Sequence, residues 1–324
     1  MSNEQRLDQL RDEAWKKGIV AGSGVDVAGG PIPKKAGYYG QPVVKPPVWT
    51  WEIPIYFFVG STGGMAAVIA LAAALFHHVD LARVSILFST IAAIISPILL
   101  IMDLGRPHLF LNMLRVFKPQ SAMSMGAWIL VLFIVCAIPT FIALEIHARG
   151  IFAGPLDSVI RIVTGALLTG SALLGVLLAT YTGVLLGATV TPAWFTHRVL
   201  LPIHFGTAGL GSSAALLELL GHRVAALNAI GFFAAGTETI LALSLLINKH
   251  GAADRALHRG VSGVVVQTTE ILAGPLSLLL RGFGLIPFAA VSFATGALLS
   301  RFGWLLAGKI SGRDPEAVFA SQQS

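Results

Sequence analysis

Long apolar runs constrain the fold of this chain more than any other feature of its sequence. Hydrophobic residues make up 55% of the 324 residues and charged residues only 12%, with a mean hydropathy of +0.78. A soluble domain typically carries about 25% charged residues. The apolar residues gather in runs of the roughly 20 residues that a helix needs to cross a bilayer. The sequence therefore predicts an all-α membrane protein with eight transmembrane helices, at about 53–76, 84–102, 124–145, 160–187, 199–220, 224–247, 261–280 and 283–300.

The two ends of the chain differ from these runs. Residues 1–50 are polar, mixed in charge and rich in Gly and Pro, and they contain no apolar core of a signal peptide. The alternating charges from Glu4 to Lys17 suggest one short helix. We expect residues 1–50 to form a soluble N-terminal arm and residues 303–324 to form a C-terminal tail.

Lys and Arg are distributed unequally between the two ends of the predicted helices. We call the membrane face from which the N-terminal arm extends side A, and the opposite face side B. With eight spans, 17 of the 22 Lys and Arg residues fall on side A, Arg301 among them, and 5 on side B. The positive-inside rule then places side A and both termini in the cytoplasm. The basic balance reflects this asymmetry and gives no reason to invoke nucleic acid.

Cysteine and histidine usage limits the redox centres that the chain itself could hold. Cys136 is the single cysteine, whereas an iron–sulfur cluster needs about four thiolates. A transmembrane haem needs axial histidines on facing helices, and only His204 is predicted inside a span. We therefore expect neither an iron–sulfur cluster nor a haem in this chain, so that partners would supply any metal centre.

Several polar side chains are predicted at similar depth near side A, because the helix directions bring their ends together. Quinol oxidation needs such groups: hydroxyl and imidazole groups can bind the two quinone oxygens, and a titratable group exchanges the accompanying protons. Each residue also has a structural interpretation, such as a core tyrosine or a paired charge at a helix end. Their convergence nevertheless predicts a quinone site made of Glu52, Tyr56, Asp103, Tyr181 and His204.

Two further carboxylates lie deeper in the predicted membrane region. Glu238 falls near the middle of the sixth span and Glu270 within the seventh. Carboxylates at such depth are costly and mark proton or ion routes unless they are paired. The sequence shows no basic residue expected at the same depth. A proton route and a helix-to-helix hydrogen bond are equally good interpretations of both residues.

Glycines recur at short spacing within the predicted helices, as in Gly60 to Gly64 and in the series Gly165, Gly170 and Gly175. Small residues at these spacings let helices approach closely. The alternative is a smooth backbone wall against a flat ligand ring.

The order of several motifs resembles one protein family. They are Trp51-Glu-Ile-Pro-Ile-Tyr-Phe-Phe-Val-Gly60, Asp103-Leu-Gly-Arg-Pro107 with Phe110 and Leu114, Ser121 to Trp128, and Tyr181-Thr-Gly183 with Pro192-Ala-Trp194. In this combination, over roughly residues 46–300, the chain resembles the membrane subunits of the NrfD/PsrC type. These are the polysulfide-reductase-like, quinone-reactive anchors of molybdopterin oxidoreductases and related complexes.

The resemblance implies an architecture and a function. It implies two four-helix bundles, with a quinone-binding bundle and connecting helix over residues 51–220 and a second bundle portion over residues 221–302. Menaquinone or ubiquinone would bind in the first bundle, near the face where a ferredoxin-like iron–sulfur subunit docks. Electrons would pass between the quinone and that subunit, and onward to a molybdopterin or cytochrome subunit. The location implied is the bacterial inner membrane.

The resemblance also assigns roles to individual residues. Tyr181 looks like the quinone-site tyrosine of the family, whereas Glu52 and Tyr56 stand where the family often has Asn and His. The loop after Asp103 would lie at the partner interface, which implicates Arg106, His108 and Arg115.

Two other classes of function stay open at this point. A transporter or ion-translocating subunit would use Glu238 and Glu270 as proton route and would have helices broken within the membrane. A purely structural anchor would tolerate replacement of Tyr181, Glu52 or His204 without any change in quinol turnover.

Overall fold

The computed structural model describes residues 44, 49–104, 107–150, 155–247 and 251–322. Every regular element within these residues is helical. The predicted short helix in the N-terminal arm lies outside the described residues, as does Arg106.

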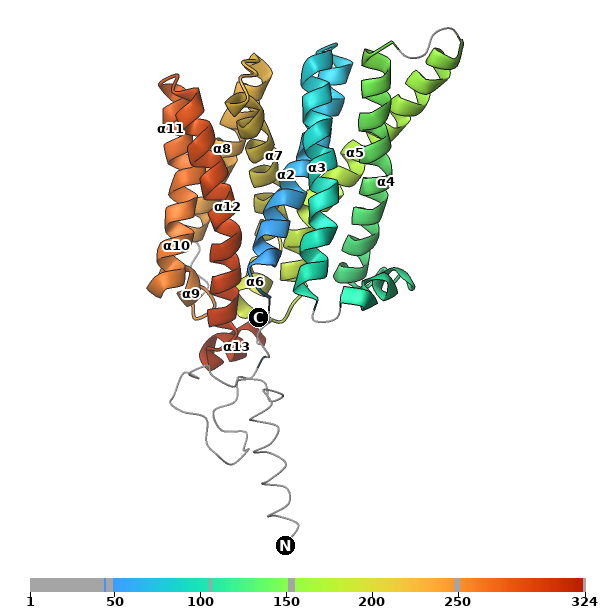
Figure 1. The fold of residues 1–324 in the computed structure, drawn as a ribbon. Helices are drawn as coiled ribbons and strands as arrows, with labels where there is room; N and C mark the ends of the chain where they lie inside the picture. The colour runs from blue at the N-terminus through green and yellow to red at the C-terminus, as the bar shows by residue number, and fades with distance from the viewer. Residues whose placement is uncertain (1–43, 45–48, 105–106, 151–154, 248–250, 323–324) are drawn as a thin grey trace, which may run out of the picture.

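Eight of the described helical segments are long and apolar enough to cross a membrane, which confirms the predicted all-α fold with eight spans (Figure 1). Seven of them are single helices, and the seventh span in chain order is α10, η2 and α11 in succession. The segments are α2 (Glu52–Leu75), α3 (Val79–Asp103), α4 (Ala122–Ala148), α5 (Pro155–Gly187), α7 (Leu200–Leu219), α8 (Ala225–Ile247), α10 (Gly260–Ile271), η2 (Leu272–Leu276), α11 (Ser277–Gly282) and α12 (Ile286–Ser311).

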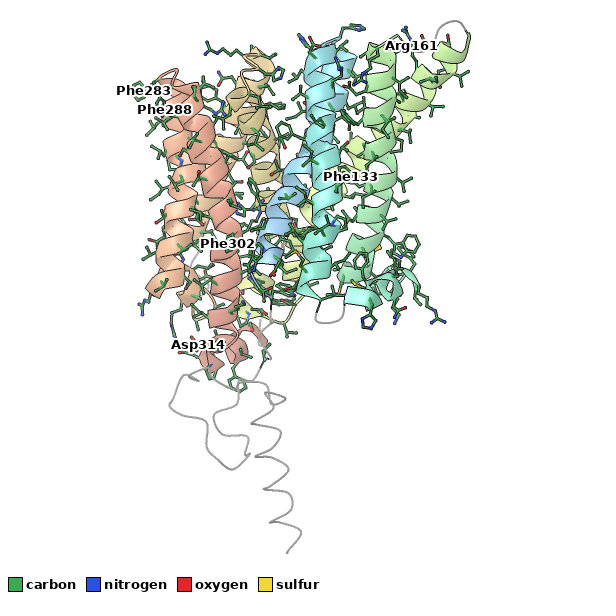
Figure 2. The ribbon with its side chains drawn as sticks, in the orientation of Figure 1. Phe133, Arg161, Phe283, Phe288, Phe302 and Asp314 are labelled. Atoms are coloured by element: carbon green, nitrogen blue, oxygen red, sulfur yellow. The ribbon has the colours of Figure 1, made fainter. Side chains whose placement is uncertain are left out.

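Four short helices lie at the end of the molecule at which α2 begins, which is side A (Figure 1). They are η1 (Pro107–Leu114), α6 (Pro192–Thr196), α9 (Arg255–His258) and α13 (Pro315–Gln322). Asp314 marks this end and Arg161 marks side B (Figure 2). The long helices therefore alternate in direction as predicted, and residues on different helices can be compared by depth.

The eighth span continues further toward side A than the predicted end at residue 300. Helix α12 continues to Ser311. Gly303, Trp304 and Leu305, which follow Arg301, are helical and buried. Arg301 itself is 0% exposed and belongs to the interior. The assignment of Arg301 to the side-A surface was therefore wrong, and one of the 17 cations assigned to side A must be removed.

Helix α2 occupies the centre of the helix packing. It contacts α3, α5, α7 and α12, while α3 and α5 also contact α4, and α7 contacts both α8 and α12. In Figure 1, α2 and α7 stand between α3 to α5 on one side and α8 to α12 on the other. These contacts are compatible with the predicted division into two four-helix bundles.

Glycines allow the closest of these approaches. A Cβ atom on Gly64 of α2 would lie 2.4 Å from the carbonyl oxygen of Gly175 on α5, and one on Gly175 would lie 2.1 Å from that of Gly64. The two backbones therefore touch at this point. This geometry supports helix packing, rather than a wall for a ligand, as the role of these glycines.

The seventh span departs from α-helical geometry inside the membrane. Its middle segment, η2, is a π-helix that contains Gly274 and Pro275, and Pro has no backbone N–H to continue the ladder. The hydroxyl of Ser292 donates a hydrogen bond of 2.7 Å to the carbonyl of Leu272. Short π segments within helices are frequent at functional sites, and this one begins just after Glu270.

Candidate functional site

An apolar cavity of about 310 Å³ lies near side A between α2, α3, α4, α5 and η1. Small-molecule sites in proteins are typically of this kind, with mostly apolar walls and a few placed polar groups. Three of the five residues predicted for the quinone site line it, namely Tyr56, Asp103 and Tyr181. The remaining walls are Trp49, Ile53, Phe57, Pro97, Leu100, Leu104, Phe110, Met113, Met123, Ala127, Leu130, Val131, Ile134 and Leu185.

Two tyrosine hydroxyl groups meet at the cavity wall. The hydroxyls of Tyr56 on α2 and Tyr181 on α5 are hydrogen-bonded to each other. Gly126 on α4 leaves room for the Tyr181 ring, because a Cβ atom there would lie 2.0 Å from Cε2 of that ring. Only one hydroxyl proton is used between the two groups, so the pair keeps a donor and several acceptor positions for a ligand oxygen.

A cluster of two carboxylates connects the cavity to the side-A surface. Asp103 accepts hydrogen bonds from the backbone N–H of Thr50 at 3.2 Å and from its hydroxyl at 2.8 Å. The same hydroxyl is also hydrogen-bonded to the carboxylate of Glu52. A hydroxyl has one proton and can donate to only one carboxylate at a time. Glu52 does not line the cavity, but Thr50 alone separates it from Asp103.

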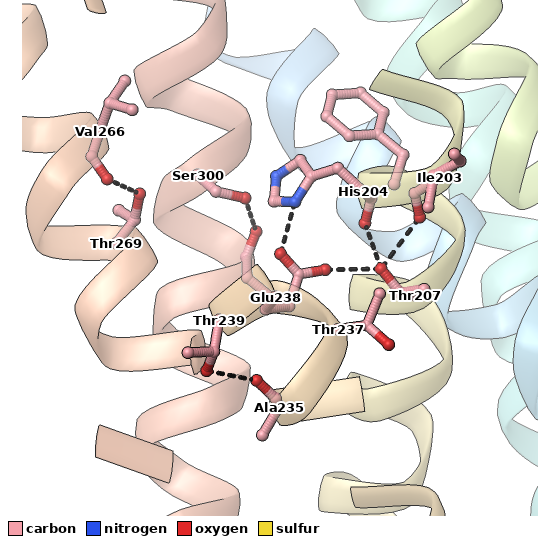
Figure 3. Close-up of polar contacts among 12 residues, drawn as sticks. Ile203, His204, Thr207, Ala235, Thr237, Glu238, Thr239, Val266, Thr269 and Ser300 are labelled. Carbon is pink, nitrogen blue, oxygen red and sulfur yellow. Dashed lines mark hydrogen bonds and ion pairs between the residues drawn. The ribbon is translucent and has the colours of Figure 1, made fainter. Parts of the chain in front are cut away.

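His204 lies in a second, separate cluster and is not among the residues that line the cavity. Its Nδ1 atom lies 2.6 Å from Oε2 of Glu238, and the hydroxyl of Thr207 donates a 2.6 Å hydrogen bond to Oε1 of the same carboxylate (Figure 3). His204 is 4% exposed and Glu238 is 3% exposed. The structure thus divides the predicted site residues between two separate places.

Arg301 also belongs to this second cluster, which was not expected from the sequence. Its guanidinium lies over the ring of Phe205, 3.9 Å from the ring centroid, and Nη2 donates to the carbonyl of Phe205 at 3.2 Å. Both Arg301 and Glu270 interact electrostatically with Glu238. The expectation that Glu238 has no basic group at its depth was therefore wrong. The signal for Arg301 was the apolar sequence that continues after it.

The loop predicted to contact a partner is only partly described. His108 on η1 and Arg115 just after it are exposed at side A, whereas the prediction for Arg106 falls outside the described residues. Phe110 and Met113 of η1 line the cavity. One short helix therefore contributes both to the cavity wall and to the side-A surface.

No group of three or more His, Cys, Asp or Glu residues is placed to hold a metal ion within the described part of the chain. Cys136 on α4 is a free thiol. The titratable groups of the two clusters are thus arranged as hydrogen-bonded acids, hydroxyls and an imidazole, which can bind polar ligand atoms and exchange protons.

The helices and the cavity define a multi-pass membrane protein with an apolar cavity near one face. The family described as polysulphide reductase, NrfD, matches residues 41–246, which is more than half of the chain. The chain therefore belongs to the NrfD polysulphide reductase family, as its motifs predicted. It is a multi-pass inner-membrane protein.

Protein NrfD of Escherichia coli (strain K12) is one similar relative. It is 29% identical to this chain over 187 residues, which cover 52% of this chain and 58% of that protein. The match thus spans less than two thirds of the relative's length.

Proposed function

We propose that this subunit exchanges electrons between a membrane quinone, menaquinone or ubiquinone, and an iron–sulfur partner subunit. The quinone head group would occupy the cavity between α2, α3, α4 and α5. The observation that carries this proposal is the meeting of the Tyr56 and Tyr181 hydroxyls and the Asp103 carboxylate at the wall of an otherwise apolar cavity. Apolar walls suit the ring and its isoprenoid tail, and the hydroxyls suit the ring oxygens.

The polar groups of the cavity fit the proton chemistry of quinol oxidation. Quinol loses both hydroxyl protons as its two electrons pass to the partner's nearest iron–sulfur cluster. In the proposed route, the Tyr181 hydroxyl holds a quinol oxygen and the Asp103 carboxylate accepts the two protons one after the other. The Thr50 hydroxyl lies between Asp103 and Glu52, so each proton can pass from one carboxylate to the other and leave at side A.

The iron–sulfur partner is proposed to dock at side A. The sequence holds one cysteine and predicts no paired histidines within the membrane, so the electrons would have no metal centre of this chain to carry them across the bilayer. The quinol would therefore be oxidised on the face where the partner's cluster lies. Exposed His108 and Arg115, together with Arg106, are proposed to contact that subunit, which would pass electrons to a molybdopterin or cytochrome subunit.

Tyr181→Phe tests the proposed site, because it keeps the ring and removes only the hydroxyl. Loss of one hydrogen bond to the bound quinol is worth about 0.5–3 kcal/mol, which corresponds to a severalfold to about hundredfold decrease in quinol turnover. Turnover would be measured in the purified complex after its assembly is verified. Thr180→Val is the matched control, since the neighbouring Thr180 hydroxyl bonds only within its own helix, to the carbonyls of Val176 and Leu177.

An assembled Tyr181→Phe complex that oxidises quinol at the parental rate would remove Tyr181 from the site and would favour the structural-anchor alternative. The ion-translocating alternative has its own supporting observation. The π segment η2 interrupts the seventh span beside Glu270, as a broken membrane helix would. Ion or proton movement in addition to electron exchange is therefore kept as the second proposal.

A further inference from the structure

The cluster of His204, Glu238, Glu270 and Arg301, of which Glu270 is partly buried and the other three are buried, lies deep within the membrane region. Glu238 is nine residues from the side-A end of α8, and Glu270 and Arg301 are each ten residues from the side-A ends of α10 and α12. At a rise of 1.5 Å per residue, these positions lie about 15 Å from the side-A helix ends. Four helices thus direct titratable or charged side chains toward one region near the middle of the bilayer.

Fixed and titratable charges do not balance in this cluster. His204 from α7 is in hydrogen-bonding contact with Glu238, and Glu270 from α10 and Arg301 from α12 are near enough to interact with its charge. Arg is always charged and can offset one carboxylate. With both carboxylates ionised and the imidazole neutral, the buried cluster would carry an uncompensated negative charge, which is costly within a membrane. Binding of one proton removes that charge.

The cluster is closed toward side B by an apolar layer, which we call the side-B seal. It consists of six residues that are no more than 2% exposed and lie three or more residues to the side-B side of the cluster: Ala208, Ala234, Ala235, Ala273, Phe293 and Ala297. The Phe293 ring packs tightly against α7 and α8, since a Cβ atom on Gly211 would lie 2.3 Å from that ring and 2.7 Å from Cβ of Ala234. A dry apolar layer offers no partners for water and does not carry protons.

The cluster is approached from side A by a groove of about 290 Å³ between the side-A ends of α7 and α8. Its polar lining includes Thr196, His197 and Ser244. Ile203 and Leu241 form its deepest part, and each lies one helical turn from a partner in the Thr207–Glu238 hydrogen bond. The groove therefore ends about one helical turn from the carboxylate, on the side opposite the seal.

We infer that Glu238 and His204, together with Glu270 and Arg301, form a buried site for one exchangeable proton that is open to side A and closed to side B. The proton is shared between the Glu238 carboxylate and the imidazole, which lie within hydrogen-bonding distance. Two buried atoms, His204 Nε2 and Arg301 Nε, have no hydrogen-bond partner among the described residues. His204 Nε2 can accept a proton or bind a water, and the Arg301 Nε–H can donate a hydrogen bond to a water. This inference goes beyond the proposed quinone chemistry and does not require a bound quinone.

The first measurement asks whether the site takes up a proton. Infrared difference spectra of the intact complex, recorded after a pH change in the absence of quinone, report protonation of buried carboxyl groups. We expect a carboxyl band in the parent that is lost or shifted in Glu238→Gln. Glu145→Gln is the control, because Glu145 is ion-paired with Arg83 near side B at 2.8 Å. An unchanged band in Glu238→Gln would overturn the proton site.

The second measurement asks whether Phe293 closes the site. The complex is placed in liposomes, a potassium diffusion potential is applied without quinone, and proton entry is followed with a trapped pH dye. Phe293→Ala should open a proton leak that the parent lacks, and Glu238→Gln in the same protein should abolish it. Phe288→Ala is the control, since Phe288 lies on the same helix but is 66% exposed (Figure 2).

The leak measurement can support or overturn the inferred proton site. A Phe293→Ala leak that persists after Glu238→Gln would show that protons do not pass through Glu238. A tight, assembled Phe293→Ala protein would show that this ring does not close the path. If Phe293→Ala fails to assemble, Phe293→Val keeps an apolar side chain and is judged by the same outcomes. Both measurements are made without quinone. A parent complex that failed to oxidise quinol would therefore count against the proposed quinone site and would leave these results unaffected.

Discussion

At the scale of single residues, the two clusters differ in what surrounds their carboxylates. Asp103 and Glu52 lie near the side-A surface and are joined through a hydroxyl, whereas Glu238 is buried against an imidazole and near a guanidinium. A surface carboxylate can exchange protons with water directly. A buried one depends on its partners, because an unpaired charge in the membrane is costly. The first arrangement suits proton release from a reaction, and the second suits storage of a proton.

Asp103→Asn is predicted to separate the structural role of this residue from its proton chemistry. The amide oxygen can still accept the hydrogen bonds from Thr50, so the start of α2 and the assembly of the complex should be kept. The amide cannot accept a proton, and loss of a general base typically costs about a hundredfold or more in rate. Quinol turnover measured against pH should fall across the whole range. Parental turnover in Asp103→Asn would exclude Asp103 as the acceptor.

At the scale of helices, the lengths of the apolar runs alone were enough to predict the eight spans. All eight predicted runs correspond to helices, because a backbone in hydrocarbon must satisfy its own hydrogen bonds and a helix does so locally. The end of α12 was missed because Arg301 was taken as a boundary charge. A guanidinium can instead remain inside when an aromatic face, a carbonyl and a nearby carboxylate surround it. The π segment in the seventh span also had no distinct signal beyond Gly274-Pro275.

The contact between α2 and α5 predicts a large difference between two glycine substitutions. Gly64→Ala adds a methyl group where the backbone of Gly175 lies within 2.4 Å, and overpacking of this kind typically costs about 1–3 kcal/mol. Gly165→Ala, on α5 itself, adds a methyl group with nothing within 4 Å. Thermal unfolding in detergent should show a lower midpoint for Gly64→Ala and little change for Gly165→Ala. Equal midpoints would contradict the close approach.

At the scale of the whole molecule, the depth of Tyr181 and His204, though not that of Arg301, could be predicted from the sequence, whereas the direction of a side chain around its helix axis could not. His204 and Tyr181 were correctly expected inside their spans, yet His204 points toward α8 and Tyr181 toward α2 and α4. Neighbouring helices decide that rotation, and apolar patterning is weak in helices that are apolar all round. The division of the polar residues into two sites therefore needed the packed structure. Which face is cytoplasmic stays a prediction from the Lys and Arg distribution.

The proposed partner surface at side A predicts an asymmetric response to charge reversal. Arg115→Glu places a negative charge beside η1, where the iron–sulfur subunit is proposed to dock, and should weaken co-purification of that subunit. Arg161→Glu makes the same change on an exposed residue at side B (Figure 2) and should leave assembly intact. If Arg161→Glu disrupted the complex and Arg115→Glu did not, the partner would have to be placed on side B.

The central claim is the location of the quinone head group, and a structure of the purified complex with bound quinone tests it most directly. We predict density for the ring in the cavity between α2, α3, α4 and α5, with a ring oxygen within hydrogen-bonding distance of the Tyr181 or Tyr56 hydroxyl. Ring density near side B, or against α7 and α8 beside His204, would contradict the proposed site.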